Sequence, residues 1–405
     1  MAHAIGAAGM TRKQDRLRRV TLWSLLIVGG AVLSAYIWDL SFGLAAAAIP
    51  VLAALVLGHR RMMGPKGVAV LTYHSVSAEQ AWLPWSREIS VHPATFERHL
   101  ATLHKMGCGI VGTRDYLDRR LAGEAPPGDT VILHFDDGYL DNWQNAVPAL
   151  DRYGMRATFF VSLNFIAPGK RVRARDGDTS GYMNWTEIAA IEEHPLFEVE
   201  PHGVDHARVP VSDRQVGRLT ADNWRSLAWM QWAATPGAKH DWFRTEQPVA
   251  VPLGTVVPES GLALAERAWT VDGREDQSSL EQRITNDLQH CQAVFEQRLG
   301  RSPRIFCWPE NAVGPEGRRI AAALGYRATT GGRGRNTAAE PAAIISRIHI
   351  GDRALGFRWQ FAEGLHLRAT VRLAQGNHYW YLLVAPMNRL RAIVLAMRGR
   401  FGQLS

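Results

Sequence analysis

The stretch Thr130-Val-Ile-Leu-His-Phe-Asp-Asp-Gly138 decides the fold prediction. Residues 131–135 are rich in β-branched and large apolar side chains, which is typical of a strand buried on both faces. The strand ends at two carboxylates, Asp136 and Asp137. In parallel α/β sheets the carboxyl ends of the strands carry the functional residues. The stretch therefore predicts a buried parallel strand with two acids at the functional edge of the sheet.

The residues that follow complete one βαβ unit. A helix is expected from Asp141 or Asn142 to Tyr153, because Gly154 can end it and 157–161 has the composition of a second strand. Adjacent side chains at a strand end point in different directions, so one acid can bind a metal while the other acts as a base. Taken alone, an Asp-Asp-Gly sequence is more often an ordinary turn.

Strand and helix patterns alternate along most of the chain. Repeated strand-then-helix units predict an α/β fold with a parallel sheet or barrel. Residues 212–278 interrupt the repeat and are expected to form an insertion, whose tryptophans either stack on sugar rings or form a small core. The further strands are expected at 67–73, 197–200, 304–308, 326–330 and 343–350, and the helices at 95–106, 185–191, 280–299 and 316–324.

Composition and charge limit the function classes. The 405 residues are 46% hydrophobic and 21% charged, enough for one large core or two modest ones. The three cysteines are too few and too scattered for a disulfide scaffold. The net charge of +8 is concentrated in residues 1–20, 59–66 and 354–405, which leaves the middle mildly acidic. This pattern argues against a nucleic-acid partner and favours contact with anionic membrane lipid.

The N-terminal region is expected to enter a membrane. After a basic segment, residues 1–19, the uncharged run 21–38 would span roughly 27 Å as a helix, close to the thickness of a bilayer core. A second apolar run follows at 44–58, so a transmembrane hairpin at 20–58 is preferred to a cleaved signal peptide or a single span. Basic residues on both flanks predict an inner (plasma) membrane location with the soluble domain on the cytoplasmic face. The basic, aromatic tail 354–405 is expected to lie in the membrane interface, or else to pack on the barrel.

Two histidines could complete a metal site. His202 and His206 are four residues apart, a spacing that places both imidazoles on one side of a helical turn. With one carboxylate of the Asp pair they form a two-His, one-carboxylate set that leaves positions open for water and substrate. A lone His pair is more often a solvated or capping feature, but this pair also follows a predicted strand. An open divalent site beside a free carboxylate is suited to hydrolysis of an ester or amide.

Six short motifs follow one another along the chain. They are Leu71-Thr-Tyr-His-Ser-Val76, His134-Phe-Asp-Asp-Gly138, Ala157-Thr-Phe-Phe-Val161, Asn184-Trp185, His202-Gly-Val-Asp-His206 and Phe306-Cys-Trp-Pro309. With these motifs in this order, the chain resembles the polysaccharide deacetylase (NodB-homology, carbohydrate esterase family 4) family over about residues 67–353, apart from the insertion. The resemblance implies a distorted (β/α) barrel, a divalent metal that is most often Zn²⁺, and removal of N-acetyl groups from amino sugars.

The resemblance assigns roles residue by residue. Asp136 matches the catalytic base, and the metal ligands match Asp137, His202 and His206. Trp308-Pro309-Glu310 matches the substrate groove, where the backbone N–H of Glu310 would face the oxyanion. His349 lies near the position of the general acid, with the substrate-side His74 as the other candidate.

The chain also departs from the family pattern. Gly203 replaces a Ser or Thr, and Glu310 replaces a Tyr. Cys307 stands where an Arg is usual, and the Asp that normally orients that Arg is missing from 329–336. We therefore expect Asp136 to lack a guanidinium partner, and His349 does not sit in a Leu-x-His frame.

The favoured hypothesis is a metal-dependent hydrolase that removes N-acetyl groups from a polysaccharide or lipid-linked glycan. A deformylase acting on a lipid-linked sugar is a related alternative. The altered groove motif supports a different class, a catalytically silent glycan-binding or assembly protein on the same barrel.

Overall fold

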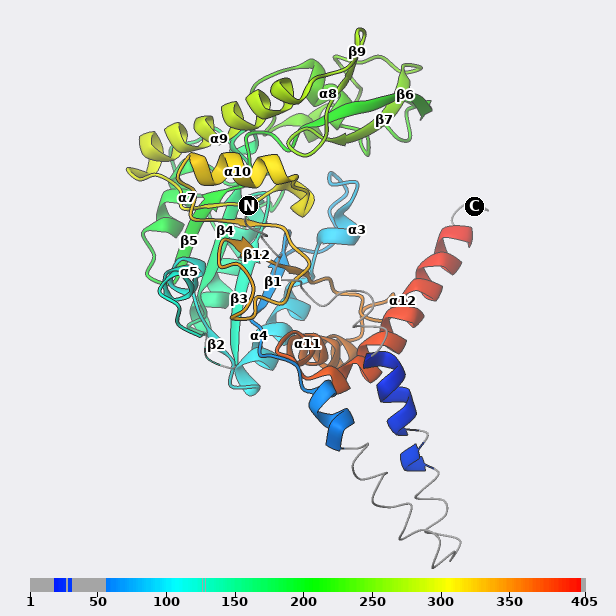
Figure 1. The fold of residues 1–405 in the computed structure, drawn as a ribbon. Coiled ribbons are helices and arrows are strands. Elements are labelled where there is room, and N and C mark those ends of the chain that lie inside the picture. Colours follow the sequence, from blue (N-terminus) through cyan, green and yellow to red (C-terminus); the bar gives the residue numbers. More distant parts are fainter. Residues whose placement is uncertain (1–17, 27, 31–55, 126, 128, 402–405) are drawn as a thin grey trace, which may run out of the picture.

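The computed structural model describes residues 18–26, 28–30, 56–125, 127 and 129–401 (Figure 1). Its centre is a six-stranded parallel sheet in the order β13-β1-β3-β4-β5, with β2 paired to β3. The predicted strand that precedes the Asp pair is β3, at the middle of this sheet. The strands are β1 (Ala69–Tyr73), β2 (Gly109–Ile110), β3 (Thr130–Phe135), β4 (Ala157–Val161), β5 (Phe197–Pro201) and β13 (Ile348–His349).

A second parallel sheet continues the first around a distorted barrel. It contains β10 (Ile305–Phe306), β11 (Ala328–Thr330) and β12 (Ile344–Ile345). The N–H of Cys307 donates to the carbonyl of Pro201 at 3.0 Å and joins this sheet to β5. On the other side the chain passes from β12 directly into β13, which pairs with β1. The predicted single strand 343–350 is therefore wrong, because it is two short strands that belong to different sheets.

The two faces of the strands bury different cores. Alternate residues such as Val70, Ile132 and Phe160 form an inner cluster together with Ile305 and Ile345. The opposite face packs against the surrounding helices in a larger cluster. This division into an inner and an outer core is the arrangement of a barrel, and it explains why the strands are apolar on both faces.

Some helices of the barrel begin where the sequence supplies a side-chain cap. The side chain of Asn184 accepts from the backbone N–H groups of Thr186 and Glu187, in a capping box that starts α7. The main helices of the barrel are α4 (Pro93–Lys105), α5 (Thr113–Leu121), α6 (Val147–Arg152), α7 (Trp185–Glu192), α9 (Gln277–Leu299) and α10 (Pro315–Ala323).

The insertion forms a separate lobe over one end of the barrel (Figure 1). Its frame is the antiparallel pair β6 (Arg208–Arg218) and β7 (Val256–Leu262), with α8 (Trp229–Ala234) packed beside them. Trp224 and Trp229 are buried in its own apolar cluster. The lobe thus has the small core that was one of the two expectations for its tryptophans.

The C-terminal segment first packs against the barrel and then projects away from it. Helix α11 (Gln360–Ala374) packs against α4 and places Leu367 and Val371 in the main core. It is followed by α12 (Tyr381–Phe401), which projects from the body in Figure 1.

The predicted transmembrane hairpin, 20–58, lies mostly outside the described residues. Parts of it at 20–26, 28–30 and 56–58 are helical. Within the described ranges, no helix combines the length and the apolar character needed to span a bilayer.

Candidate active site

The structure brings the three predicted metal ligands together. One donor atom from each of Asp137, His202 and His206 can be chosen so that all lie within 4.8 Å of one another. Asp137 lies two residues after the end of β3, and its Oδ1 is 3.3 Å from Nε2 of His202, which directly follows β5. The segments that follow β3 and β5 therefore place their candidate ligands at the same end of the barrel.

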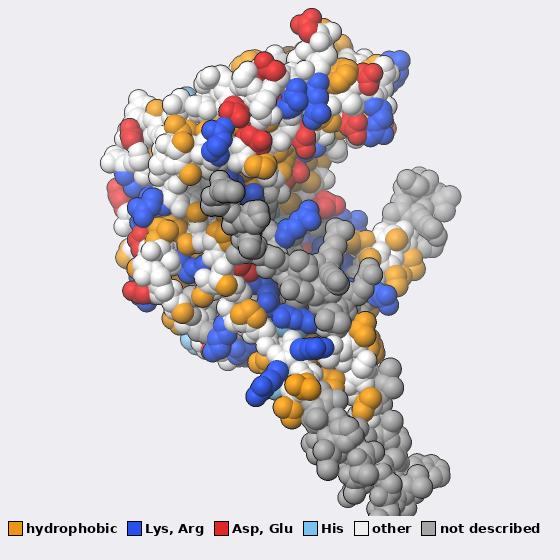
Figure 2. Space-filling model, viewed as in Figure 1, with side chains coloured by type: hydrophobic (Ala, Val, Ile, Leu, Met, Phe, Trp, Pro, Cys, Tyr) orange, Lys and Arg blue, Asp and Glu red, His pale blue; other side chains and the backbone are white. Residues whose placement is uncertain are grey.

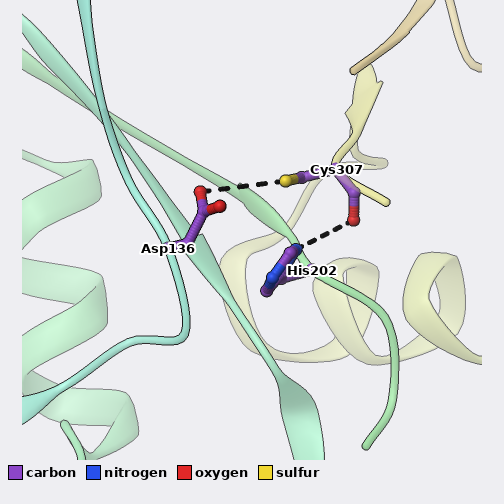
Figure 3. Close-up of side chains that lie close together, drawn as sticks. All are labelled: Asp136, His202 and Cys307. Atoms are coloured by element: carbon purple, nitrogen blue, oxygen red, sulfur yellow. Dashed lines mark hydrogen bonds between the residues drawn. The ribbon is translucent and has the colours of Figure 1, made fainter. Parts of the chain in front are cut away.

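A backbone contact orients His202 as a ligand. Its Nδ1 lies 3.0 Å from the carbonyl oxygen of Cys307, so this nitrogen carries the proton and donates it (Figure 3). The Nε2 lone pair is then directed towards Asp137. Histidines that bind metals are usually held by such a contact from the second ring nitrogen. The three side chains fit a divalent metal by donor type, spacing and orientation.

The two histidines are not on a helix, contrary to the prediction. Residues 202–207 form a loop in which Gly203 has φ +80° and His206 has φ +52°. The N–H of Leu163 donates to the carbonyl of Gly203 and fixes the loop against the end of β4. A left-handed φ disfavours side chains with a Cβ, so glycine suits this position.

A second possible donor group overlaps the first. Asp136, His202 and Cys307 also lie close together, with Cys307 Sγ 3.8 Å from Asp136 Oδ1 (Figure 3). All three are buried, and Nδ1 of His202 is already engaged by the Cys307 carbonyl. This group is therefore less suited to an ion that must meet water and substrate.

Asp136 has a guanidinium partner that the sequence analysis did not find. Nη1 of Arg347 lies 2.7 Å from Asp136 Oδ1, and both side chains are only 2% exposed. Nε of Arg347 donates to Oδ1 of Asn311 at 2.7 Å, which holds the guanidinium in place. The expectation that Asp136 lacks such a partner is wrong, because an arginine from the junction of β12 and β13 reaches it.

This environment sets the charges beside the ligands. Burial raises the pKa of Asp136, but Arg347, His202 and His74 more than offset it and hold the pKa well below its usual value. Burial lowers the pKa of His74 to about 4, despite the nearby carboxylates of Asp136 and Asp137. Nε2 of His74 lies 3.9 Å from Asp136 Oδ2. The pair thus combines an ionised carboxylate with a neutral imidazole at neutral pH.

A cavity of about 430 Å³ opens beside this group. His74, Asp137 and His206 line it, whereas Asp136 lies behind His74 and is 2% exposed. The opposite wall comes from the insertion, including Trp229 and Trp232. The cavity therefore joins charged groups of the barrel to an aromatic wall of the added lobe.

Comparison with known proteins identifies the domain that carries this site. Residues 123–245, which include Asp136, Asp137 and both histidines, match the family model described as polysaccharide deacetylase. This stretch is therefore similar to a polysaccharide deacetylase domain. A curated relative from Bacillus subtilis (strain 168), "Putative polysaccharide deacetylase YxkH", is 28% identical over 142 residues. The match covers 35% of this chain and 44% of that relative, so it spans less than half of the relative's length.

A solved structure supports the fold of the deacetylase domain. The structure titled "Probing the structure and mechanism of de-N-acetylase from Aggregatibacter actinomycetemcomitans" has a TM-score of 0.50 and 18% sequence identity. The superposition covers 69% of this chain and 94% of that one. At this identity the likeness shows a shared NodB-type α/β fold.

The groove motif of the deacetylase domain is arranged differently from the prediction. Trp308 is fully buried against Phe306, and Pro309 is also buried, so neither side chain lines the cavity. Their assignment as substrate-binding side chains is therefore not supported. Glu310 does line it, with φ +51°, and accepts from Nη1 of Arg208 at 2.8 Å. This contact joins the motif to the first strand of the insertion.

His349 is close to the site but does not face it. Its Nε2 lies 3.2 Å from the carbonyl of Glu88, and it lines another cavity. Its ring lies behind that of His74, with 5.2 Å between the centroids. The predicted role as general acid is not supported by this placement, and His74 is the better-placed imidazole.

One sequence signal could have revealed Arg347. It lies within the apolar run Ile344-Ile-Ser-Arg-Ile-His-Ile350, which was expected to be a buried strand. A buried arginine requires an acidic partner. Asp136, at the end of another strand, was the obvious candidate.

Proposed function

We propose that this chain is a metal-dependent hydrolase that removes N-acetyl groups from amino sugars of a glycan. The observation that carries the proposal is the convergence of Asp137, His202 and His206 at the wall of a cavity, next to the Asp136–Arg347 pair. The polysaccharide deacetylase family match over the same residues supports it.

The ligand set defines how the site would bind an amide. Asp137, His202 and His206 would hold a divalent metal, which would supply a Lewis acid to polarise the amide carbonyl and acidify water. The Cys307 carbonyl keeps His202 in the tautomer needed for binding. Arg347 keeps Asp136 ionised and fixes its orientation.

Asp136 and His74 handle the protons of the reaction. The Asp136–His74 pair takes a proton from the attacking water as its oxygen bonds to the carbonyl carbon. The same proton passes to the sugar nitrogen as the carbon–nitrogen bond breaks. The products are acetate and a free amino sugar. His74 is the proton donor in this scheme because it lines the cavity.

The cavity wall is suited to a sugar ring. Trp85, Tyr139 and Tyr182 line it from the barrel, and Trp229 and Trp232 line it from the insertion. Flat aromatic faces pack against the apolar faces of sugars. Because the insertion covers the site, we infer that it accepts the end of a glycan or a short lipid-linked sugar.

The silent glycan-binding alternative has lost its main support. It rests on the altered groove motif, in which Cys307 replaces an arginine, and Arg347 supplies that charge from the junction of β12 and β13. The deformylase alternative differs from the deacetylase only in the acyl group that is removed. Identifying the released acid as acetate or formate therefore distinguishes these two activities.

Acetate release tests the proposal directly. The purified chain, supplied with Zn²⁺ and N-acetylated oligosaccharides, should release acetate, and a chelator should stop it. Asp136→Asn should reduce the rate at least about 100-fold, since general base catalysis contributes this much. Asp115→Asn, a surface carboxylate on α5, is the matched control. An inactive metal-loaded protein, or an Asp136→Asn variant with full activity, would support the silent alternative.

We also infer that the chain works at a membrane, with its hairpin at 20–58 and its domain on the cytoplasmic face. Exposed apolar side chains at both described flanks of the hairpin support this, including Trp23, Leu26 and Leu57. Placement in the cytoplasm would favour a lipid-linked precursor as substrate. A reporter fused to the C-terminus tests the location, because activity of a reporter that works only outside the cytoplasm would refute it.

A further inference from the structure

A second cavity, of about 490 Å³, lies on the side of the barrel where the two ends of the chain meet. The helix at 18–26, α11, α12 and β13 all contribute to its wall. Met63 forms a β-bridge with Asn377, and the N–H of Gly64 donates to the carbonyl of Gly376. The cavity is therefore a junction of the N-terminal and C-terminal segments, which the catalytic scheme does not use.

The wall of this cavity is strongly basic. It contains four arginines, among them Arg335 and Arg391, and three histidines, among them His349 and His366. Among the described residues of its wall, no carboxylate is present. Clustered guanidinium groups are the usual means by which proteins recognise phosphate, because each offers a fork of N–H donors.

Two polar atoms of the wall are buried without a hydrogen-bond partner among the described residues, as expected where a polar ligand binds. They are Nε of Arg335 and Oγ1 of Thr370. Burial, with a contribution from Arg18, lowers the pKa of Arg335, and Glu340 offsets this only in part. Nη1 of Arg335 points to His378 at 2.7 Å, and so its guanidinium is held within the cluster. Buried donors without partners are costly and rare in native proteins.

The rest of the wall is apolar. Leu22, Met62, Leu373 and Val384 line it, and the first two are almost fully buried. Where α12 leaves the body, hydrophobic side chains also gather on the surface (Figure 2), including the exposed Leu390 and Ile393. A basic centre bordered by apolar surface matches an amphiphile better than a free anion.

The cavity adjoins the catalytic one. His349 lines the basic cavity and His74 lines the catalytic cavity, and their ring centroids are 5.2 Å apart. A ligand in the basic cavity would therefore lie close to the residues that handle protons in the deacetylase site.

We propose that the basic cavity binds the phosphate group of a membrane lipid, with Arg335, Arg391 and Thr370 as its main donors. The lipid chain follows the apolar wall towards α12. This site positions the domain at the membrane surface independently of the reaction at Asp137.

Vesicle binding of the full-length chain tests the site. Vesicles of phosphatidylcholine containing phosphatidic acid should bind it more tightly than vesicles with the same amount of phosphatidylserine. Arg391→Gln should weaken the binding to phosphatidic acid about tenfold, the effect of losing a charged hydrogen bond. Arg389→Gln is the matched control, since Arg389 is exposed on the same helix and does not line the cavity.

A second variant and a soluble probe complete the test. Thr370→Val keeps the shape and removes the unpartnered hydroxyl, so it should also weaken binding to phosphatidic acid while its melting temperature stays unchanged. Equal losses in Arg389→Gln and Arg391→Gln, or equal binding to both anionic vesicles, would overturn the site in favour of general surface attraction. Inorganic phosphate that binds as tightly as the lipid, and with the same dependence on Arg391, would overturn the lipid assignment.

Discussion

The ion pair of Asp136 and Arg347 is the residue-scale feature on which the proposed chemistry depends most. Both side chains are almost fully buried, and Arg347 comes from a part of the chain 211 residues away. The net stability of buried pairs is small, but removing one partner leaves a buried charge without compensation. The pairing with Arg347 therefore keeps Asp136 ionised, and it makes the protein sensitive to mutation of either residue.

Arg347→Met should raise the pKa of Asp136, because burial then acts on the carboxylate without the guanidinium. Since the base must be ionised, the acidic limb of the kcat/KM profile should move to higher pH. The free energy of unfolding should fall by about 3–5 kcal/mol. Arg347→Lys, which retains the charge but not the contact with Asn311, should show a smaller change in both. An acidic limb at the wild-type pH in Arg347→Met would refute this role.

Asp141 offers a separate test of the electrostatics. Its carboxylate accepts from Ser75 Oγ at 2.6 Å and from the N–H of Val76 at 2.9 Å, and so anchors the loop that carries His74. Burial raises the pKa of Asp141 to about 6, although these hydrogen bonds oppose the change. The folded state thus binds the proton more tightly than the unfolded state, and stability falls as pH rises from about 4 to about 6.

Asp141→Asn removes this titration and keeps an acceptor for Ser75. The free energy of unfolding of the wild type, minus that of the variant, should fall by about 3 kcal/mol between pH 4 and pH 7. Chemical denaturation at several pH values measures it. A difference that does not change with pH would show that Asp141 is ionised throughout.

At the scale of elements, the loop after β5 holds both histidine ligands. Gly203→Ala places a Cβ at φ +80° and should cost about 1–2 kcal/mol. Because the loop carries His202 and His206, the variant should also bind Zn²⁺ more weakly in competition with a chelator. Gly107→Ala has a similar backbone conformation, φ +67°, at the end of α4, and should lose stability without losing affinity. Equal zinc affinity in both variants would show that the conformation of this loop does not affect metal binding.

The insertion should act on substrate binding. Trp232→Ala removes an aromatic face from the cavity wall and should raise KM for N-acetylated oligosaccharides about tenfold, since such contacts contribute about 1–2 kcal/mol. The value of kcat should change much less. Trp269→Ala, on the exposed strand β8 (Trp269–Thr270), is the control. A fall in kcat with unchanged KM would contradict a binding role for Trp232.

The sequence predicted the elements better than their connections. Strands β3 and β4 were predicted almost to the residue because their apolar runs are bounded by clear stop signals. The i and i+4 spacing of His202 and His206 does bring the two side chains together, but in a tight loop and not on the predicted helical turn. Arg347 was missed because its partner is distant in sequence, and the two meet only because β13 pairs with β1, which in turn pairs with β3.

At the scale of the whole molecule, barrel closure explains where the chemistry lies. The acids follow β3, the histidines follow β5, and the arginine enters between β12 and β13. The insertion covers this end of the barrel, while the segments from both ends of the chain meet beside β13. The described basic residues from both ends of the chain therefore line a different cavity from the aromatic side chains, which is consistent with the proposed binding of a lipid in one cavity and a sugar in the other.

The position of a bound metal tests the central claim most directly. Anomalous diffraction at the zinc edge from crystals of the Zn²⁺-loaded protein should show one strong peak about 2.0–2.2 Å from Asp137 and from a ring nitrogen of both His202 and His206. Asp136 should remain paired with Arg347 and outside the coordination sphere. A peak between Asp136, His202 and Cys307, or no peak near Asp137, would contradict the account.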